Sequence, residues 1–240
     1  MHRTICDVQM RRERSMPKNI AHVRIPKIVL FEESDNRIIY MTEWIPGTIA
    51  KNTSKTAAQQ AFFQSCDFLQ YVFRNLHKKE LERLTKRSTL QLLTAFPFYL
   101  VLSLIRNRDI IPELLRAASI VFRNSPVFLM SRQYSLTHRD LHFENILIHH
   151  KYVYLIDFQF SCVSPHITDY VYTLRYCWDK SYLKNNLYTE IQRSRLQNNT
   201  DVQNFKTLLL MHAVQGLTAR NFTSRTMKHI KQYLQFGLSI

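Results

Sequence analysis

Two β-hairpins are predicted from runs rich in β-branched and aromatic residues that are bounded by turn-forming residues. The first comprises residues 28–32 and 37–43, joined by the turn-forming stretch at 34–36. The second comprises residues 146–149 and 152–158, which are separated by only two residues. Because the two runs of each pair are close in sequence, we expect each pair to form neighbouring strands.

Helices are predicted between and after these hairpins. Apolar residues recur at mixed three- and four-residue steps between residues 57 and 79, which predicts a helix with a broad core-facing side. Residues 169–178 and 204–222 are also predicted to be helical, with a polar linker at 197–201 between them. The chain contains no internal repeat and no low-complexity tract, so a single fold built from these segments is expected.

The longest apolar run covers residues 90–105 and is flanked by basic residues. Its sixteen residues include Gln91 and Pro97, and they fall short of the about 20 that a membrane-spanning helix requires. We therefore predict a buried helix that is broken near Pro97. Peripheral contact with a membrane surface stays open, because basic residues flank the run.

Composition predicts a folded protein, because 45% of the residues are hydrophobic and the chain is long enough to bury a substantial core. The four cysteines, Cys6, Cys66, Cys162 and Cys177, are scattered and form no C-x-x-C pair. We therefore expect neither a zinc site nor a disulfide framework, and a reducing cytoplasm is the predicted location. The first fifteen residues lack the apolar core of a secretory signal.

The formal net charge of +15 makes binding to nucleic acid or to an anionic membrane a rival function. No zinc-finger spacing and no aromatic RNA-recognition motif accompanies this charge, and Lys and Arg are scattered along the chain. A basic, solvated surface is therefore the favoured interpretation, and nucleic-acid binding is not predicted.

The stretch LTHRDLHFENILIHHKYVYLIDFQF, residues 136–160, carries the candidate chemistry. Each of its polar residues taken alone is more often structural, but their order changes that interpretation. Phosphoryl transfer from a nucleotide requires a carboxylate that accepts the proton of the attacking hydroxyl, and oxygen ligands for Mg²⁺. The pattern H-R-D-L-x-x-x-N supplies Asp140 as the base and Asn145 as a metal ligand, and Asp157 supplies a second ligand. The predicted hairpin would bring Asn145 and Asp157 near each other, where one cation would bridge them.

The motif HRDLHFENIL followed by LIDFQ resembles the aminoglycoside phosphotransferase and choline kinase superfamily, relatives of protein kinases that phosphorylate small molecules. Protein kinases usually carry Lys where His142 stands and Gly where Gln159 stands. Asp169 also follows Asp157 by only twelve residues, which leaves little room for a protein-kinase activation segment.

The resemblance implies an α+β, protein-kinase-like fold in two lobes. Residues 1–47 would form a truncated small N-lobe with a β-hairpin, and residues 48–240 a mostly helical C-lobe that carries the catalytic-loop hairpin. Residues Thr42, Glu43 and Trp44 would then form the hinge, whose backbone groups meet the adenine of the nucleotide. A hairpin that simply ends in a Pro-Gly turn is the alternative interpretation of this stretch.

Four further residues receive roles from the resemblance. Glu13 would orient the phosphate-binding lysine, although a solvated charge explains it equally well. Asp169 and His138 would brace the catalytic loop rather than react. His142 would approach the acceptor or the nucleotide.

The residues that grip phosphate in the family have no counterpart in this sequence. A Gly-rich loop and a third-strand lysine would precede the helix that bears Glu13, but only twelve residues precede Glu13 and none is Gly. The three glycines, Gly47, Gly216 and Gly237, do not open a phosphate loop. Three explanations stay open: a truncated or misassigned reading frame, a naturally degenerate site, or nucleotide held in a reduced way.

The predicted function is transfer of the γ-phosphoryl group of ATP, with Mg²⁺, to a hydroxyl of a small molecule. Beyond Asp169 only Asp179, Glu190 and Asp201 are acidic, against ten Lys and Arg, so a polycationic acceptor is not expected. A sugar, a phosphorylated metabolite or a lipid-linked glycan fits this charge better. The alternatives are a pseudokinase or an N-terminally truncated fragment, a lipopolysaccharide-core sugar kinase, and a protein kinase. The sequence gives no indication of oligomeric state.

Overall fold

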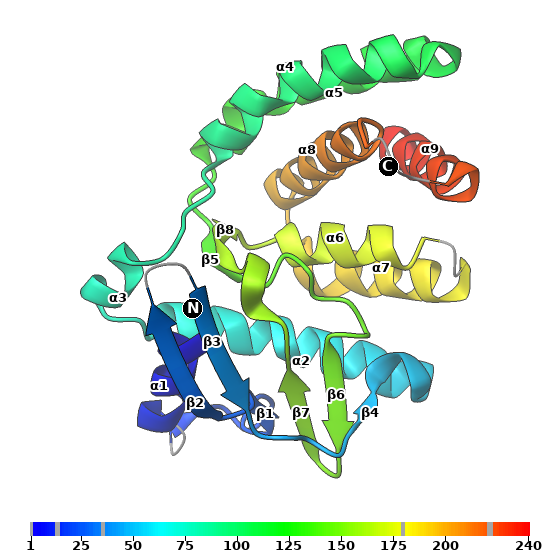
Figure 1. Cartoon of the computed structure of the whole chain (residues 1–240). Helices are drawn as coiled ribbons and strands as arrows, with labels where there is room; N and C mark the ends of the chain where they lie inside the picture. The colour runs from blue at the N-terminus through cyan, green and yellow to red at the C-terminus, as the bar shows by residue number, and fades with distance from the viewer. Residues whose placement is uncertain (1, 13–14, 35–36, 179–180, 220–222) are drawn as a thin grey trace. The chain divides into compact units, whose positions relative to one another are not determined.

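The computed structural model describes residues 2–12, 15–34, 37–178, 181–219 and 223–240 (Figure 1). Strands and helices are largely segregated along the chain, so the predicted α+β class is confirmed. In chain order the helices and strands of the described residues are α1 (His2–Arg12), β1 (Val23–Arg24), β2 (Ile28–Ser34), β3 (Arg37–Thr42), β4 (Thr48–Ile49), η2 (Ala50–Asn52), α2 (Lys55–Arg74), α3 (Lys78–Glu82), α4 (Thr89–Arg106), η3 (Arg108–Ile110), α5 (Ile111–Met130), β5 (Tyr134–Thr137), β6 (Ile146–His149), β7 (Tyr152–Leu155), η4 (Phe158–Phe160), β8 (Cys162–Pro165), α6 (Thr168–Tyr176), α7 (Ser181–Arg195), α8 (Asn199–Gly216) and α9 (Ser224–Ser239).

By its internal contacts the chain divides into two compact units. Unit 1 comprises Met1–Lys86 and Ser135–Val163, and unit 2 comprises Arg87–Tyr134 and Ser164–Ile240. Unit 1 therefore holds the candidate catalytic loop together with the N-terminal segment. The predicted lobes, divided after residue 47, stay a prediction.

A four-stranded sheet organises unit 1. Its strand order is β1-β7-β6-β4, with β1 parallel to β7 and antiparallel pairing elsewhere. In the β6–β7 pair, Ile146 lies opposite Leu155 and His149 lies opposite Tyr152, which confirms the predicted second hairpin. Ile146, Val153 and Leu155 are buried on one face, as the alternation of side chains along strands requires. Helix α2 contacts β1, β6 and β7, so the core of unit 1 lies between this helix and the sheet.

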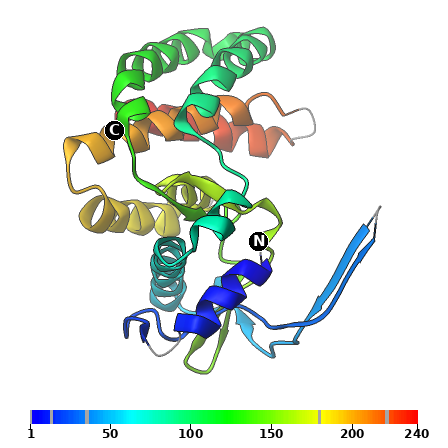
Figure 2. The ribbon, with the colours of Figure 1, turned by 90° about the vertical axis from the view of Figure 1, so that its left-hand side faces the viewer.

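The other predicted hairpin is also confirmed. β2 and β3 pair antiparallel, from Ile28 opposite Thr42 to Ser34 opposite Arg37. The pairing is irregular between Ile28 and Leu30, and Figure 2 shows the hairpin extending away from the four-stranded sheet of unit 1. Val29 is accordingly exposed.

The helix predicted at residues 57–79 is in fact two helices. After α2, the side chain of Asn75 donates a hydrogen bond from Nδ2 to the carbonyl oxygen of Tyr71 at 2.8 Å. The N–H of His77 then donates to the carboxylate of Glu80 at 2.7 Å, which starts α3. The single-helix prediction was wrong because side chains that bond to the backbone compete with continuation of a helix.

Unit 2 is built from stacked helices. Figure 1 shows α4 and α5 on one side of α8 and α9, and α6 and α7 on the other. Helix α8 is central, because it contacts α4, α5, α6 and α9. Its successive residues Leu208, Leu209 and Leu210 are all buried, and three consecutive helical positions point in different directions. The core of unit 2 therefore surrounds this helix.

Helix α4 contradicts the prediction for residues 90–105 in two respects. It continues through Pro97 without a break, and only 17% of its 18 residues are buried. Pro97 lies on the exposed side of the helix. By length and composition alone this helix, with a mean hydropathy of 1.4, is long and apolar enough to cross a membrane. Its apolar sequence predicted a core helix, but only the packing of unit 2 decided which sides are covered.

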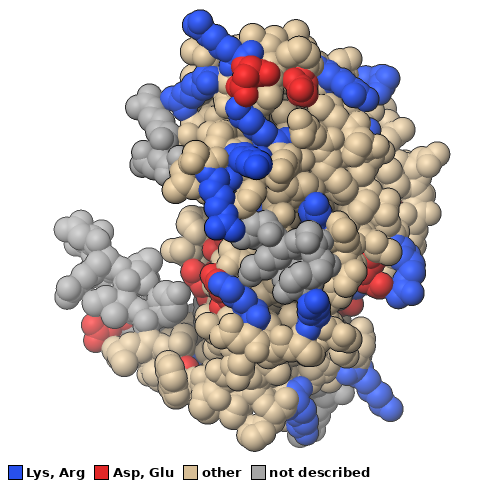
Figure 3. Space-filling model, turned by 90° about the vertical axis from the view of Figure 1, so that its right-hand side faces the viewer, with Lys and Arg blue, Asp and Glu red and all other residues tan. Residues whose placement is uncertain are grey.

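The predicted basic, solvated surface agrees with Figure 3, in which Lys and Arg lie scattered among neutral residues with few Asp and Glu. The distribution of Lys and Arg bears on function, because one continuous basic groove would favour binding to nucleic acid.

Candidate active site

Asp140 lies in a tight loop between β5 and β6. Its carbonyl oxygen accepts hydrogen bonds from the N–H of His142 at 2.9 Å and from Nδ2 of Asn145 at 2.8 Å. The preceding residue, Arg139, has a φ of 65°, in the left-handed region that is unfavourable for residues other than glycine. The loop is therefore held in an unusual backbone shape by bonds to Asp140.

Asn145 connects this loop to the hairpin. Its Nδ2 also donates to Oδ2 of Asp140 at 3.2 Å, and its carbonyl oxygen accepts from the N–H of Ile156 at 3.2 Å. The amide nitrogen is therefore committed to Asp140. In the described residues no donor bonds Oδ1 of Asn145, so this oxygen is available to a cation such as Mg²⁺, which prefers oxygen ligands.

Asp157 lies at the same end of the hairpin. It directly follows Ile156, which is bonded to Asn145, and it has a left-handed backbone with φ 61° and ψ 63°. In a regular strand Asp157 would point to the face opposite Asn145, because side chains alternate. The left-handed residue ends that alternation and starts the turn η4. The hairpin thus brings Asn145 and Asp157 to one end, as its sequence predicted.

His138 is fully buried between the loop and the residue before Asp157. Its Nε2 donates to the carbonyl oxygen of Ile156 at 2.7 Å, and its ring centroid lies 4.7 Å from that of Phe158. Burial lowers the pKa of His138 to about 4, although the bond to Ile156 and the charges of Asp140 and Asp157 act in the opposite direction. The neutral imidazole therefore connects the loop to the Asp157 turn, and its bracing role stays a prediction.

His142 lies beside the candidate base. Its Nδ1 accepts from the N–H of Glu144 at 3.2 Å, so Nε2 carries the hydrogen in the neutral ring and lies 3.5 Å from Oδ1 of Asp140. Glu144 in turn forms an ion pair with Lys51, whose N–H donates to the carbonyl oxygen of Phe143 at 3.1 Å. Sequence reasoning missed Lys51 and Glu144, because the pair joins positions 93 residues apart and leaves no local pattern.

Of the predicted hinge residues, Thr42 is the last residue of β3, and Glu43 and Trp44 directly follow it. The N–H of Glu43 donates to the carbonyl oxygen of Lys27 at 2.9 Å, and its carboxylate accepts from the N–H of Lys27 at 3.0 Å. An adenine at this position would therefore use other backbone groups of the stretch. Trp44 is 87% exposed, so its ring is open to a ligand or to solvent.

Two predicted supporting residues are not part of this cluster. Glu13 lies outside the described residues. Asp169 belongs to unit 2, where it is buried in the first turn of α6, and its bracing role stays a prediction.

A metal at this site would depend mainly on oxygen ligands from outside the protein. Among the described residues, no three His, Cys, Asp or Glu side chains gather as a metal-binding group. Asn145 and Asp157 offer one amide and one carboxylate oxygen, which suits Mg²⁺, because this ion usually keeps waters and substrate phosphates as its other ligands.

The model of the phosphotransferase enzyme family matches residues 16–195 of the chain. An aminoglycoside phosphotransferase from Alicyclobacillus acidocaldarius aligns over 99% of this chain and 81% of its own, with a TM-score of 0.61 and 14% identity. A spectinomycin phosphotransferase in complex with ADP and spectinomycin aligns over 99% of this chain and 82% of its own, with a TM-score of 0.59 and 13% identity. A choline/ethanolamine kinase family protein from Mesorhizobium loti aligns over 100% of this chain and 84% of its own, with a TM-score of 0.54 and 13% identity. A search of curated proteins gave no match. At these identities the structural likeness establishes a shared kinase-like fold.

Proposed function

This chain belongs to the phosphotransferase enzyme family, and we propose that it transfers the γ-phosphoryl group of ATP to a hydroxyl of a small molecule, with Mg²⁺. One observation carries the proposal: Nδ2 of Asn145 bonds both the carbonyl oxygen and the carboxylate of Asp140, while the same residue is tied to the hairpin that ends in Asp157. These contacts support a base and two metal ligands within one small framework.

The proposed roles follow from these contacts. Asp140 orients the acceptor hydroxyl and takes its proton, because its carboxylate is held in place by Asn145 on one side and approached by His142 on the other. Asn145 and Asp157 hold Mg²⁺, which neutralises charge on the phosphates. His138 keeps the Asp157 turn against the loop.

For the acceptor we propose a small open depression in unit 2. The C-terminal helices form the acceptor pocket in the family that the sequence resembles, and this depression is lined by residues of α4, α6 and α8. Tyr172 and His212 stack there with ring centroids 3.9 Å apart, and Nη1 of Arg175 lies 3.2 Å from Nε2 of His212. The polar residues of the lining are Arg87, Tyr99, Tyr172, His212 and Gln215.

The lining of this depression contains no carboxylate. Of the acidic residues beyond Asp169, Glu190 is paired with Arg193 and Asp201 is buried in the first turn of α8. A polycation would therefore find little negative charge here, whereas aromatic rings and an arginine suit a sugar or a phosphorylated compound. We propose a neutral or anionic acceptor.

A cytoplasmic location fits the cysteines. Cys66, Cys162 and Cys177 are all buried, and Cys162 is a free cysteine, as expected in a reducing compartment that supplies ATP.

The test is thermal denaturation of the full chain with ATP, with and without Mg²⁺. Ligand at about a hundred times its dissociation constant adds about 2.7 kcal/mol of stability, so the expected result is a Mg²⁺-dependent rise in melting temperature. The rise should disappear in Asp157→Ala and persist in Gln159→Ala, which removes only a 3.4 Å hydrogen bond from Nε2 of Gln159 to Oδ2 of Asp157. Both side chains are exposed, and the melting temperature of each variant without nucleotide verifies that it folds.

A rise that is equal in wild type and Asp157→Ala would contradict the metal role of Asp157, and no rise in a folded sample would contradict ATP use. If ATP binds, hydroxyl acceptors can be compared by ATP turnover: neutral sugars, sugar phosphates, choline, an aminoglycoside and a serine peptide. Preferential turnover of the aminoglycoside would contradict the proposed acceptor class, and preferential turnover of the peptide would indicate a protein kinase.

A further inference from the structure

The outward side of α4 is apolar. Phe98, Val101 and Ile105 are 64%, 54% and 61% exposed, although most helices of folded proteins present polar residues to water. These positions follow at steps of three and four, so they lie on one side of the helix. No Lys, Arg, Asp or Glu occurs between residues 89 and 105 to interrupt it.

The opposite side of α4 is fixed in the core of unit 2. Phe96 and Ser103 are buried there, and Oγ of Ser103 donates to the carbonyl oxygen of Val214 in α8 at 2.9 Å. Asn107, just after the helix, donates from Nδ2 to the carbonyl oxygen of Leu217 at 3.2 Å. Because the inner side is anchored at these points, the apolar outer side cannot rotate inward without breaking them.

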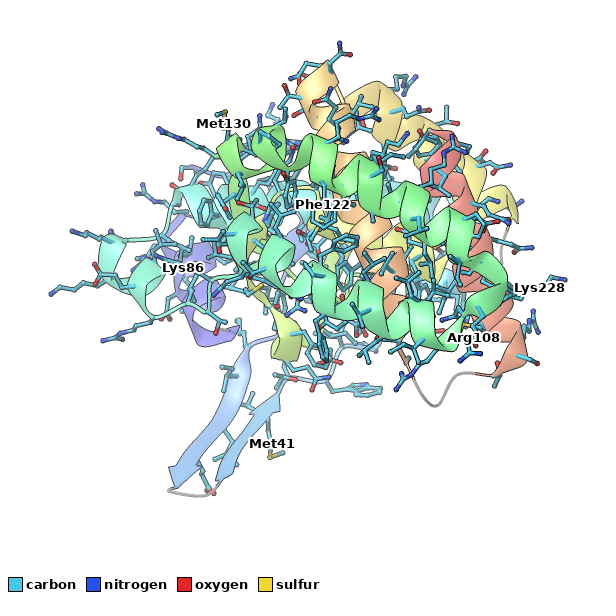
Figure 4. The ribbon with its side chains drawn as sticks, turned by 90° about the horizontal axis from the view of Figure 1, so that it is seen from above. Met41, Lys86, Arg108, Phe122, Met130 and Lys228 are labelled. Carbon is cyan, nitrogen blue, oxygen red and sulfur yellow. The ribbon has the colours of Figure 1, made fainter. Side chains whose placement is uncertain are left out.

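Helix α5 extends this apolar surface. Leu115, Phe122 and Leu129 recur every seven residues and are 54%, 52% and 45% exposed. The ring of Phe122 contacts that of Phe96 at a centroid distance of 5.9 Å, so this edge of α5 adjoins α4. Figure 4 shows the two helices side by side, with Phe122 at the middle of α5. We call the set Phe98, Val101, Ile105, Leu115, Phe122 and Leu129 the apolar face.

Positive charge borders the apolar face. Arg116 and Arg123 each follow an apolar-face residue by one position, so they form a parallel row along the exposed side of α5. Lys206 of α8 belongs to the same cluster: burial lowers its pKa, and the charges of Arg116 and Arg123 lower it further. Crowded like charges beside apolar residues favour an anionic partner.

The acidic residues of this region do not balance the charge. Residues 87–134 contain six Arg but only two acidic residues, Asp109 and Glu113. The carboxylate of Asp109 is already paired with Lys231 at 2.5 Å.

From these observations we propose that the apolar face docks unit 2 on the surface of an anionic lipid bilayer, with Phe98 and its neighbours in the interfacial layer and Arg116 and Arg123 on lipid headgroups. Helix α4 lies flat on the surface, because its inner side is occupied by α8. Anionic lipids are the natural counterpart of a row of arginines beside an apolar strip. A symmetric contact with a second copy fits less well, since each arginine row would face its own duplicate.

The experiment is flotation of the full chain with vesicles, without nucleotide, so the result does not depend on the proposed enzymatic function. Vesicles of phosphatidylglycerol and phosphatidylethanolamine are compared with vesicles of phosphatidylcholine. We expect binding to the anionic vesicles, reduced by at least about tenfold in the double variant Phe98→Ser/Ile105→Ser, because two exposed apolar anchors are lost. The variant Arg116→Gln/Arg123→Gln should weaken binding to anionic vesicles to the level seen with phosphatidylcholine.

Val202→Ser is the matched control, because it removes an exposed apolar side chain of unit 2 outside the apolar face. It should bind like wild type, and Phe98→Trp/Ile105→Leu should retain binding by keeping apolar anchors. All variants change exposed positions, and their melting temperatures verify that they fold.

Three results would overturn the proposal. Absence of binding to every vesicle would do so, as would equal binding of wild type and Phe98→Ser/Ile105→Ser. A concentration-dependent dimer that Phe98→Ser/Ile105→Ser abolishes, without vesicle binding, would instead assign the apolar face to a second copy of the chain.

Discussion

Asn145 illustrates how one side chain can serve two purposes in a small site. Its nitrogen holds Asp140 by two hydrogen bonds, which leaves its oxygen for a cation. The cost of the left-handed backbone at Arg139 and Asp157 is of order 1–3 kcal/mol each, and bonds to neighbouring residues must compensate for it. Backbone strain of this kind gathers where chemistry requires a fixed geometry, and here it occurs directly before Asp140 and at Asp157 itself.

Asp140→Asn separates binding from chemistry. The amide removes the proposed base while keeping the size of the side chain, so phosphoryl transfer should fall about 10²–10⁴-fold. Binding of ATP with Mg²⁺ should persist, because the proposed metal ligands are unchanged. ATP turnover and the nucleotide-dependent rise in melting temperature measure the two effects, with Gln159→Ala as control. An equal loss of both would indicate that Asp140 acts in nucleotide binding instead.

The buried His138 makes the free energy of unfolding depend on pH. Its folded pKa of about 4 lies below its ordinary value of 6.5, so between these values the unfolded chain takes up a proton that the folded protein excludes. Its contribution is therefore fully present above about pH 6.5 and is lost as the pH falls toward 4, by up to about 3 kcal/mol. Urea denaturation at pH 7, 5.5 and 4.5 measures the effect.

In His138→Gln the amide nitrogen can still donate to Ile156, but the titrating group is gone, so the fall in stability with acid should be smaller. Some dependence will persist, because burial also lowers the pKa of His166. His229→Gln in α9 is the control for loss of a histidine elsewhere. Identical acid profiles for wild type and His138→Gln would refute this assignment.

At the scale of elements, α4 shows that one helix can be both part of the core and part of the surface. A Ser88 capping box starts it, with Oγ accepting from the N–H of Gln91 at 3.1 Å. Pro97 then sits in its middle without ending it. A proline in the interior of a helix removes one backbone hydrogen bond, so this helix persists because its inner side is packed on α5 and α8.

Pro97→Ala should therefore stabilise the protein. The change restores an N–H donor in the helix, and an interior proline is about 3 kcal/mol less favourable than alanine, so a gain of about 1–3 kcal/mol is expected. Pro112→Ala is the matched control, because that proline lies in the first turn of α5, where its missing N–H costs nothing. Chemical denaturation should show stabilisation for Pro97→Ala only. Destabilisation by Pro97→Ala would mean that α4 does not continue through this position.

At the scale of the whole molecule, the N-terminal segment packs within unit 1, which holds the candidate site. β1 pairs in parallel with β7 through Val23 opposite Val153, and β7 leads directly to Asp157. Ile5 and Val8 of α1 are fully buried, and α1 contacts α2. The hairpin that carries the candidate site thus depends on residues of α1 and β1.

A fragment of residues 48–240, the predicted C-lobe, should for this reason be less stable than the full chain. The fragment lacks β1, so the edge of β7 has no partner strand. It also lacks α1, so apolar surface of α2 is exposed. Denaturation midpoints of the fragment and the full chain, together with near-ultraviolet circular dichroism, test this. A fragment that unfolds at the same midpoint as the full chain would support the predicted division after residue 47 as a boundary between folding units.

The sequence predicted most where the relevant contacts are local. Both hairpins were found because strand and turn signals lie within a few residues. The motif HRDLHFENIL followed by LIDFQ resembles a family whose model matches the chain. Prediction failed where the local structure depends on which side chains form contacts in the folded protein. The break after Asn75 depended on which side-chain bonds form, and Lys51 and Glu144 meet across 93 residues.

By itself, the sequence determined the fold family, the two hairpins and the order of the candidate catalytic residues, because these are encoded in short-range patterns of residue type. Only the tertiary structure decided that Asn145 holds Asp140, that His138 is buried and neutral, and that one side of α4 is covered while the other is exposed. Burial depends on which elements pack together. The same apolar residues of α4 are therefore compatible with a core, a membrane or a surface until α5 and α8 cover one side.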